Sequence, residues 1–582
     1  MLHLALRLLA VVGVATCASL PSSAQSLGPS QSEQPNPIQV ENALPGAPVR
    51  AWLQPAVPPT NVEGYTSEVS VLPGEKVHFH VSTEEGEQYR IEVYRLGWYG
   101  GLGARLLACL PSCDGSKAGH RYPPPSFAGG TAGWPVTDTL PVPADWITGY
   151  YYALFRVTSG PLQDYDTRGW AAFVVREPAS RHSRILVQVP VNTWQAYNPW
   201  GGKSLYDHNS RHLARAAKVS FDRPLAVTAQ GPFDAEYNLV RFLEREGYDV
   251  SYQTDVDTDA DPNSLLQHRL VVVAGHDEYW TKGMRDAFDA ARDAGTNLAF
   301  TGSNAAYWQI RYEDNRRTIV AYKNTSDPEP DPALKTVQFQ HLDPPRPECE
   351  LMGIMHMQLR PHQSGPVDYT VTDAAAADPW FAGTGLKPGD LVLGVVGDEW
   401  DSLPDPPPAE CAKPGMKVLF RYHGPPLDAV AVRYTAPSGA RIFAGGAQQL
   451  SWRLDTFNLG RFGRTLPPDE RFQQFMRNAL DDLERPAAPT ALVTRRLRRT
   501  VKLQLLATPD ARVLKFVLFR HPGAGFFALD DAAAVQVCET TSGKCMERRL
   551  RPGAYRFAAV AVDAWGNSYP TFADSVLIRP RH

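Results

Sequence analysis

The stretch RLVVVAGHDEYWTKGMRDAFDAARDAGTNLAFTG, Arg269 to Gly302, alternates strand and helix signals. An unbroken apolar run ends at Gly275, a segment with apolar residues at helical spacing ends at Gly295, and a second short apolar run follows. Strands that are almost wholly apolar and alternate with helices are typical of a parallel sheet covered on both faces. The stretch therefore predicts a doubly wound α/β core.

The same alternation occurs before this stretch. RILVQVP (184–190) and YDVSYQT (248–254) have the pattern of strands, and AEYNLVRFLEREG (235–247) has helical spacing with Gly247 as its stop. We expect the sheet to continue, with insertions, to about Leu483. The predicted α/β domain covers residues 179–485.

The flanking regions show the two-residue alternation of β-strands. In 63–178, runs such as YRIEVYRLGW and GWAAFVVRE are separated by Gly and Pro turns, which predicts an N-terminal β-sandwich. In 486–582, runs such as VLKFVLFRHP and YRFAAVAVDAWGN predict a second sandwich of immunoglobulin or fibronectin type III character. Several domains are expected, since 582 residues exceed what one hydrophobic core normally holds.

The N-terminus has the pattern of an export signal. Arg7 precedes an apolar stretch, and small residues lead to Ala24, so residues 1–24 read as a signal peptide and predict a secreted or periplasmic protein. A lipoprotein at Cys17 is disfavoured, because Thr16 is a poor residue before a lipidated cysteine. Residues 25–62 are rich in Pro and Ser and read as an extended linker. After signal removal we expect no membrane association, because no other stretch reaches about 18 apolar residues.

The remaining cysteines and the charge also restrict the function. Six cysteines form three local groups, which in an exported protein predicts disulfide bonds: Cys109 with Cys113, Cys349 with Cys411 and Cys538 with Cys545. Their connectivity stays open at this point, with the last pair favoured by the turn in CETTSGKC. The formal net charge of -4 gives no reason to expect a nucleic-acid partner.

Polar clusters follow three of the predicted strands. They are VNTWQAYNPWGGKSLYD (191–207), HDEYW (276–280) and SNAAYWQIRYED (303–314). Ligands of open α/β sheets bind beyond the carboxyl ends of the strands, so one rim would gather Tyr197, Asn198, His276, Glu278 and Asn304. Each residue alone could be a packing or turn residue. A carboxylate directly after a buried strand, however, is costly unless it is paired or bound to a metal.

Nucleophilic catalysis finds little support in the sequence. There is no G-x-S-x-G elbow, and the cysteines of the core are expected in a disulfide. Carboxylate, phenol and imidazole remain at the rim. This combination suits Lewis-acid catalysis by a hard metal ion.

Long blocks of the chain resemble a known family. VYRLGWYGGLGARLL, VPVNTWQAYNPWGGKSLYD, LVRFLEREGYDVSYQTDVD and the stretch from VVVAGHDEYW to WQIRYE are similar to the large (beta) subunit family of N,N-dimethylformamidase, over roughly residues 65–480. The resemblance implies an amidohydrolase that acts on linear amides. It also implies a mononuclear non-haem iron, in the ferric state, held by two tyrosines and one glutamate.

The resemblance assigns roles to individual residues. Tyr197 and Glu278 match two metal ligands, and the second tyrosine is expected within ITGYYYALFRV, where Tyr151 is preferred and Tyr150 and Tyr152 stay open. His276, Asn304 and Lys323 match further active-site positions, and Glu399 of GDEWD matches a second glutamate, a candidate base. Phenolate and carboxylate are hard donors that suit ferric iron.

The chain also departs from that family. No small partner subunit is evident, and an export signal and a C-terminal sandwich are present, so the small-molecule amide substrate stays open. A homo-oligomer is one expectation for the assembly. The alternative function is a non-enzymatic, secreted surface or glycan-binding protein on the same scaffold. The retained rim residues Tyr197, Glu278 and Asn304 favour the enzyme.

Overall fold

A computed structural model describes most of the chain. The described residues are 34–53, 61–123, 130–160, 168–226, 231, 233, 236–359, 365–425, 427–457, 459, 464–507 and 509–580. The predicted signal peptide lies outside these ranges. No helix in this part of the chain is long and apolar enough to cross a membrane.

Two short helices occupy the segment expected as an extended linker. α1 (Pro37–Asn42) is capped by Asn36, whose side chain accepts a hydrogen bond from Gln39 N, and α2 is Val49–Trp52. Ile38 and Trp52 are fully buried. The Pro-rich composition suggested an extended chain, but burial of these two apolar side chains and the cap stabilise helices instead.

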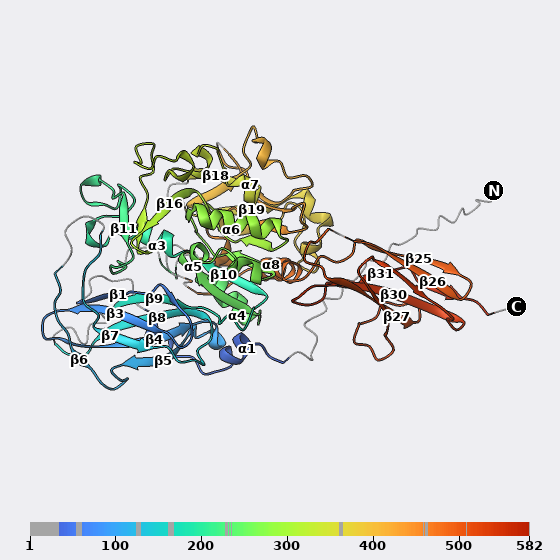
Figure 1. The fold of residues 1–582 in the computed structure, drawn as a ribbon, viewed down its shortest axis with the longest axis horizontal. Coiled ribbons are helices and arrows are strands. Elements are labelled where there is room, and N and C mark those ends of the chain that lie inside the picture. The colour runs from blue at the N-terminus through green and yellow to red at the C-terminus, as the bar shows by residue number, and fades with distance from the viewer. Residues whose placement is uncertain are drawn as a thin grey trace, which may run out of the picture. The chain divides into compact units, whose positions relative to one another are not determined.

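The first strands form two packed sheets (Figure 1). Their bounds are β1 (Val62–Thr66), β2 (Ser70–Val71), β3 (Lys76–Thr83), β4 (Gln88–Leu96), β5 (Ala104–Leu110), β6 (Lys117–Ala118), β7 (Asp138–Pro141), β8 (Gly149–Val157) and β9 (Arg168–Val175). One sheet has the order β1-β3-β7 and the other β2-β9-β8-β4-β5, with β6 paired to β4. Phe79, Phe155 and Phe173 lie in the core between them.

The strand β8 contributes to two cores. Consecutive side chains of a strand point to opposite faces. Tyr151 therefore lies in the core between the two sheets, whereas Tyr150 and Tyr152 join the core of the central region.

A nine-stranded mixed sheet forms the centre of the chain. It has the order β12-β10-β13-β15-β24-β23-β22-β19-β20. The bounds are β10 (Ile185–Val189), β12 (Val250–Thr254), β13 (Leu270–Val273), β15 (Asn297–Phe300), β19 (Val367–Val371), β20 (Leu391–Val396), β22 (Lys417–Tyr422), β23 (Ala429–Thr435) and β24 (Arg441–Ala444). The first five strands in this order pair in parallel, and the other four continue the sheet in antiparallel fashion. The antiparallel half was not anticipated from the sequence.

Helices cover both faces of the parallel half. On one face α6 (Lys282–Asp293) buries Met284 and Phe288 in a cluster with Val271. On the other, α4 (Tyr237–Arg245) and α8 (Glu470–Leu483) pack in the cluster that contains Val272. The remaining helices are α3 (Val191–Tyr197), α5 (Asp255–Ala260) and α7 (Cys349–Met352).

Smaller sheets accompany the central one. A four-stranded sheet has the order β11-β17-β16-β14, and β18 pairs with β21. Their bounds are β11 (Lys218–Ser220), β14 (Tyr279–Thr281), β16 (Trp308–Glu313), β17 (Thr318–Val320), β18 (Met355–Leu359) and β21 (Glu399–Ser402). These strands carry several side chains of the candidate site.

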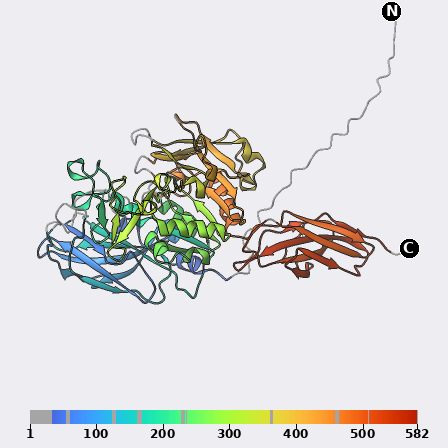
Figure 2. The same ribbon diagram turned by 45° about the horizontal axis from the view of Figure 1, so that its top comes forward.

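The last region again consists of two sheets around one core, with strands drawn in orange to red in Figure 2. The bounds are β25 (Ala491–Leu497), β26 (Thr500–Leu506), β27 (Lys515–Pro522), β28 (Val535–Thr540), β29 (Lys544–Glu547), β30 (Gly553–Val562), β31 (Thr571–Phe572) and β32 (Val576–Ile578). In β26, Val501, Leu503 and Leu505 are buried and alternate with exposed residues. The chain is thus a multidomain, β-rich protein.

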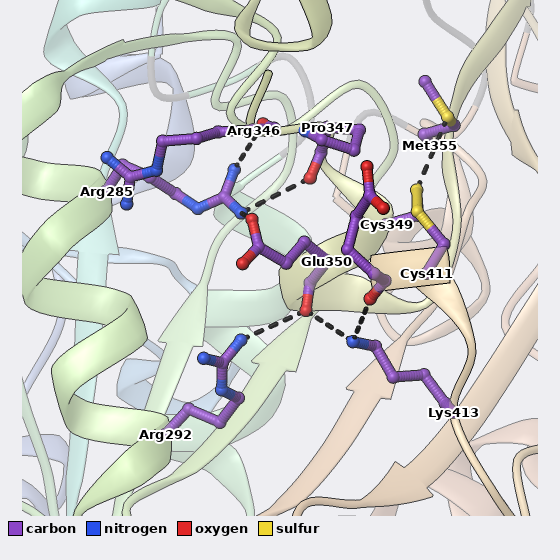
Figure 3. Close-up of a disulfide and its surroundings, with 10 residues drawn as sticks. Arg285, Arg292, Arg346, Pro347, Cys349, Glu350, Met355, Cys411 and Lys413 are labelled. Carbon is purple, nitrogen blue, oxygen red and sulfur yellow. Dashed lines mark hydrogen bonds and ion pairs between the residues drawn. A yellow bond between two sulfur atoms is a disulfide. The ribbon is translucent and has the colours of Figure 1, made fainter. Parts of the chain in front are cut away.

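A disulfide bond joins the two cysteines within each of the three groups, Cys109–Cys113, Cys349–Cys411 and Cys538–Cys545, which settles the connectivity that the sequence left open. Figure 3 shows the second pair, beside which Arg285, Arg292 and Lys413 donate hydrogen bonds to Glu350. Disulfides are typical of extracellular or periplasmic proteins.

Candidate functional site

The candidate site lies where four parallel strands end. Tyr197 lies on α3, which follows β10; His276 and Glu278 follow β13; Asn304 follows β15; and Gln448 follows β24. The carboxyl ends of neighbouring parallel strands meet at one edge of the sheet. Gln448 was not among the predicted residues, although the same rule applies to the GGAQQL segment after its strand.

A close approach of two backbones brings His276 and Asn304 together. A Cβ atom built on Gly302 would lie 1.9 Å from the carbonyl oxygen of Gly275, so only glycine allows the two strand-end loops this contact. Asn304 follows with φ of 54°, a left-handed conformation that asparagine tolerates better than most residues. The side-chain amide nitrogen of Asn304 then lies 3.5 Å from His276 Nε2.

Two phenols converge on one buried carboxylate. The hydroxyl of Tyr197 donates to Glu278 Oε2 at 2.9 Å, and the hydroxyl of Tyr206 donates to Glu278 Oε1 at 2.6 Å. The two rings are stacked with centroids 4.4 Å apart, and Glu278 is 1% exposed. Both oxygens of this carboxylate are therefore occupied by phenol hydroxyls.

A second carboxylate lies on the other side of the imidazole. His276 Nε2 is 3.0 Å from Glu399 Oε2 and 3.5 Å from Glu278 Oε2. Asn304 Nδ2 donates to Glu399 Oε2 at 2.7 Å, and Gln448 Nε2 lies 3.3 Å from His276 Nδ1. The side chain of Glu399 is 13% exposed and that of His276 2%, so Glu399 is the more accessible of the two.

Burial and charge set the protonation states of this pair. Burial alone would lower the pKa of His276, but the neighbouring carboxylates, Glu399 first, raise it to about 9. Burial alone would raise the pKa of Glu399, but the His276 cation lowers it to about 2. At neutral pH the two side chains form an ion pair.

Burial and a nearby negative charge keep the phenols of Tyr197 and Tyr206 protonated. Burial, and then the charge of Glu278, raise the pKa of Tyr197 and that of Tyr206 well above the usual range. Neither tyrosine ionises in these surroundings unless a cation compensates for the charge.

Lys323 lies behind Tyr206. Its Nζ is 3.5 Å from the centroid of the Tyr206 ring and 4.8 Å from those of Tyr279 and Trp308, and it donates a hydrogen bond to the Tyr279 hydroxyl. Its backbone φ is 58°. Burial lowers the pKa of Lys323 to about 7. The structure thus places this predicted residue beside one of the two phenols.

The structure does not bring Tyr151 to this cluster. Its hydroxyl donates to the carbonyl oxygen of Ile147 at 2.7 Å, and its ring stacks between Trp146 and Phe173 in the N-terminal core. The predicted convergence of Tyr151 with the oxygens of Tyr197 and Glu278 is therefore corrected: Tyr206 holds that position.

The neighbours of Tyr151 face the central region but contact other side chains. The ring of Tyr150 packs against Trp194 and Tyr252, and that of Tyr152 packs against Trp170 and Phe233. Tyr206 belongs to the 191–207 strand-end cluster, which is the sequence signal that could have indicated it.

Asn198, also expected at the rim, holds the loop after α3. It is fully buried, and its Nδ2 donates to Pro224 O at 2.9 Å. Among the described residues, no group of three or more His, Cys, Asp and Glu side chains is arranged to hold a metal ion. Any metal at Glu278 would need tyrosine oxygens as further donors.

Residues 90–463 match a family described as N,N-dimethylformamidase beta subunit-like, C-terminal. Since the match covers more than half of the chain, the protein belongs to this family. Family membership suggests an amidohydrolase. No curated protein matches the chain.

Solved structures match only a small part of the chain. The titin kinase with its flanking domains is 12% identical, the twitchin kinase region from C. elegans 19%, and domains d3–d4 of the rat CD45 extracellular region 13%. Each match covers 16% of this chain with a TM-score of 0.14. The chain spans 17% of the titin and twitchin structures and 50% of the CD45 structure. A TM-score this low supports no conclusion.

Proposed function

We propose that this protein is an iron-dependent amidohydrolase that cleaves the C–N bond of a small linear amide. One observation carries the proposal: two phenol hydroxyls, from Tyr197 and Tyr206, meet on the buried carboxylate of Glu278. The His276–Glu399 ion pair lies directly beside this group. Membership of the dimethylformamidase family supports the reaction class.

The donors at Glu278 fit a hard cation. Tyr197, Tyr206 and Glu278 would hold it, because phenolate and carboxylate are hard oxygen donors and three protein ligands leave positions open. Burial makes both tyrosines poor acids, so their ionisation requires a compensating positive charge. The buried Oδ1 of Asn304, which has no hydrogen-bond partner among the described residues, is a further polar atom at the rim.

When bound, ferric iron would polarise the amide carbonyl and acidify a water molecule. Glu399 is a weak base, because the His276 cation lowers its pKa, and a weak base can accept a proton from such an acidified water. Glu399 accepts the proton of the attacking water as the new C–O bond forms. The same proton then goes to the amine nitrogen as the C–N bond breaks, which leaves a carboxylic acid and an amine.

Other residues orient the base and one phenol. Asn304 and His276 both bind Glu399 Oε2, which fixes the direction of the carboxylate. The ammonium group of Lys323 lies over the ring of Tyr206 and so helps to fix the position of this ring. Export to an oxidising compartment, in keeping with the three disulfides, would give the enzyme small amides from outside the cell or in the periplasm.

Metal analysis of the purified wild-type protein tests the proposal most directly. We expect iron in equimolar amount, a visible phenolate-to-iron absorption band, and release of amine from at least one of formamide, acetamide and dimethylformamide. A protein that binds no iron after reconstitution, or an iron-loaded protein that releases no amine from any linear amide, would overturn it.

A further inference from the structure

The side chain of Arg223 is enclosed by the loop that joins Tyr197 to Tyr206. Arg223 is 1% exposed, and in the described part of the chain no carboxylate offsets the effect of burial on its charge. Its guanidinium donates to oxygens of both the loop and its own segment: Nε to Gln195 Oε1 (3.3 Å) and Ser220 O (3.2 Å), Nη1 to Trp200 O (3.1 Å) and Lys203 O (2.8 Å), and Nη2 to Gln195 O (3.1 Å) and Asn198 O (3.0 Å).

Four of these acceptors are backbone carbonyls that bracket Tyr197. The carbonyls of Gln195 and Asn198 lie at the end of α3, where the last carbonyls of a helix have no helical partners; the Gln195 carbonyl also accepts from the backbone nitrogen of Asn198. Gly201 and Gly202 follow with φ of 74° and 91°, which turns the chain back around the guanidinium. One side chain therefore holds the backbone on both sides of Tyr197.

Further hydrogen bonds join the same two segments. Asn198 Oδ1 accepts from the backbone nitrogens of Trp200 and Ala226, both at 3.1 Å. Asn209 Nδ2 donates to the carbonyl oxygen of Tyr197 at 2.9 Å, close to Tyr206 in the chain. The loop from Tyr197 to Tyr206 is thus fixed at its start, at its turn and near its end.

A buried cation without an acid partner is costly, so its retention needs an explanation. Burial lowers the pKa of Arg223 to about 9, and the side chain is still charged at neutral pH. An apolar side chain would fill the same space without the cost of desolvating a charge. An apolar residue, however, could not supply a planar guanidinium, whose N–H groups donate to several carbonyls at once.

We propose that Arg223 is the positioning residue of the tyrosine pair. This inference rests on the proposed function, in which Tyr197 and Tyr206 are metal ligands. Arg223 touches neither metal nor substrate. It fixes the backbone that carries both phenols, so that their oxygens meet at Glu278 before a metal binds.

The test compares Arg223→Lys with Arg285→Lys. Arg285 is the control, because its side chain is fully buried and also donates to two backbone carbonyls, Arg346 O and Pro347 O, away from the tyrosine loop; unlike Arg223, it also pairs with Asp289 and Glu350. We expect Arg223→Lys to lower iron affinity, measured by chelator competition, by at least ten-fold, and to shift or weaken the visible band. Arg285→Lys should lower the melting temperature and leave both iron readouts unchanged.

Chemical rescue separates positioning from general stability. Guanidinium at low millimolar concentration should restore the band of Arg223→Ala, whereas sodium chloride at equal ionic strength should not. Gln195→Ala, which removes a single acceptor and is the milder change, should lower iron affinity several-fold even if the arginine variants fail to fold.

The outcomes distinguish the two proposals. Wild-type protein without iron overturns the proposed function and this inference with it. Wild-type protein with iron, together with Arg223→Lys or Gln195→Ala of unchanged iron affinity and unchanged band, overturns the inference alone.

Discussion

Glu278 and Glu348 are both buried carboxyl groups of the central region, 1% and 0% exposed. Glu278 accepts two phenol hydrogen bonds and lies 3.5 Å from His276. Neither oxygen of Glu348 has a hydrogen-bond partner on another described residue, and burial raises its pKa to about 8. Burial of an acid is therefore not in itself a sign of function. A functional site is indicated where hydrogen-bond donors and a positively charged side chain surround the acid.

The largest expected effect comes from removing the charge of Glu278. Glu278→Gln should abolish stoichiometric iron binding and lower turnover by on the order of 10²–10³-fold or more, because a neutral amide is a poor ligand for a hard cation. Glu348→Gln should leave iron content and turnover unchanged. Elemental analysis and amine release measure both, and circular dichroism checks the fold. Iron retained in full by Glu278→Gln would remove the distinction between the two acids.

The next effect is expected from removing the disulfide Cys349–Cys411, which adjoins Glu348 in the sequence. This change should alter stability alone. Cys349 and Cys411 are 62 residues apart. Replacing both by serine should lower the free energy of unfolding by ~4 kcal/mol, since the bond restricts a long loop in the unfolded chain. Iron affinity of the folded variant should stay at the wild-type value. A double variant as stable as the wild type in urea unfolding would contradict this expectation.

Tyr206 and Tyr151 are two tyrosines whose hydroxyls have different partners. The Tyr206 hydroxyl binds a carboxylate, and that of Tyr151 binds a backbone carbonyl. Tyr206→Phe should lower iron affinity by about 10–100-fold and bleach part of the phenolate band, because it deletes only the proposed donor oxygen. Tyr151→Phe should cost ~1 kcal/mol of stability and leave the band intact. The opposite pattern, with the band lost in Tyr151→Phe, would return the ligand role to the strand β8.

These pairs also show what the sequence could predict. The parallel order of β10, β13 and β15 and the gathering of His276, Glu278 and Asn304 follow from local patterns and from a general rule about strand ends. Three consecutive tyrosines in β8 cannot be told apart in this way, because alternate side chains face different cores and the pattern does not say which core holds the site.

Other features depend on contacts between distant segments. The antiparallel strands β19, β20, β22 and β23 extend the sheet within a region read as insertions. The helix α1 forms in a Pro-rich segment because Asn36 caps it and Ile38 is buried. Neither the partners of a strand nor the burial of one isoleucine can be read from composition, since both are decided by tertiary packing.

The smallest expected effect is the part of the pH dependence of stability that comes from Glu348. Burial raises the pKa of this carboxyl in the folded protein from 4.5 to about 8. The folded chain then holds a proton that the unfolded chain releases between these values, so its contribution to stability is complete below about pH 4.5 and is lost as the pH rises through about 8. Urea unfolding at about pH 6.5 and at pH 9 should show the wild type losing ~2 kcal/mol more than Glu348→Gln, whose amide does not ionise. Glu177→Gln, at a partly buried carboxyl whose pKa is also raised, to about 7, serves as a control that should leave the Glu348 contribution in place. Equal losses in the wild type and in Glu348→Gln would show that Glu348 ionises as readily in the folded chain as in the unfolded one, and the contrast with Glu278 would then no longer rest on the surroundings of the two acids.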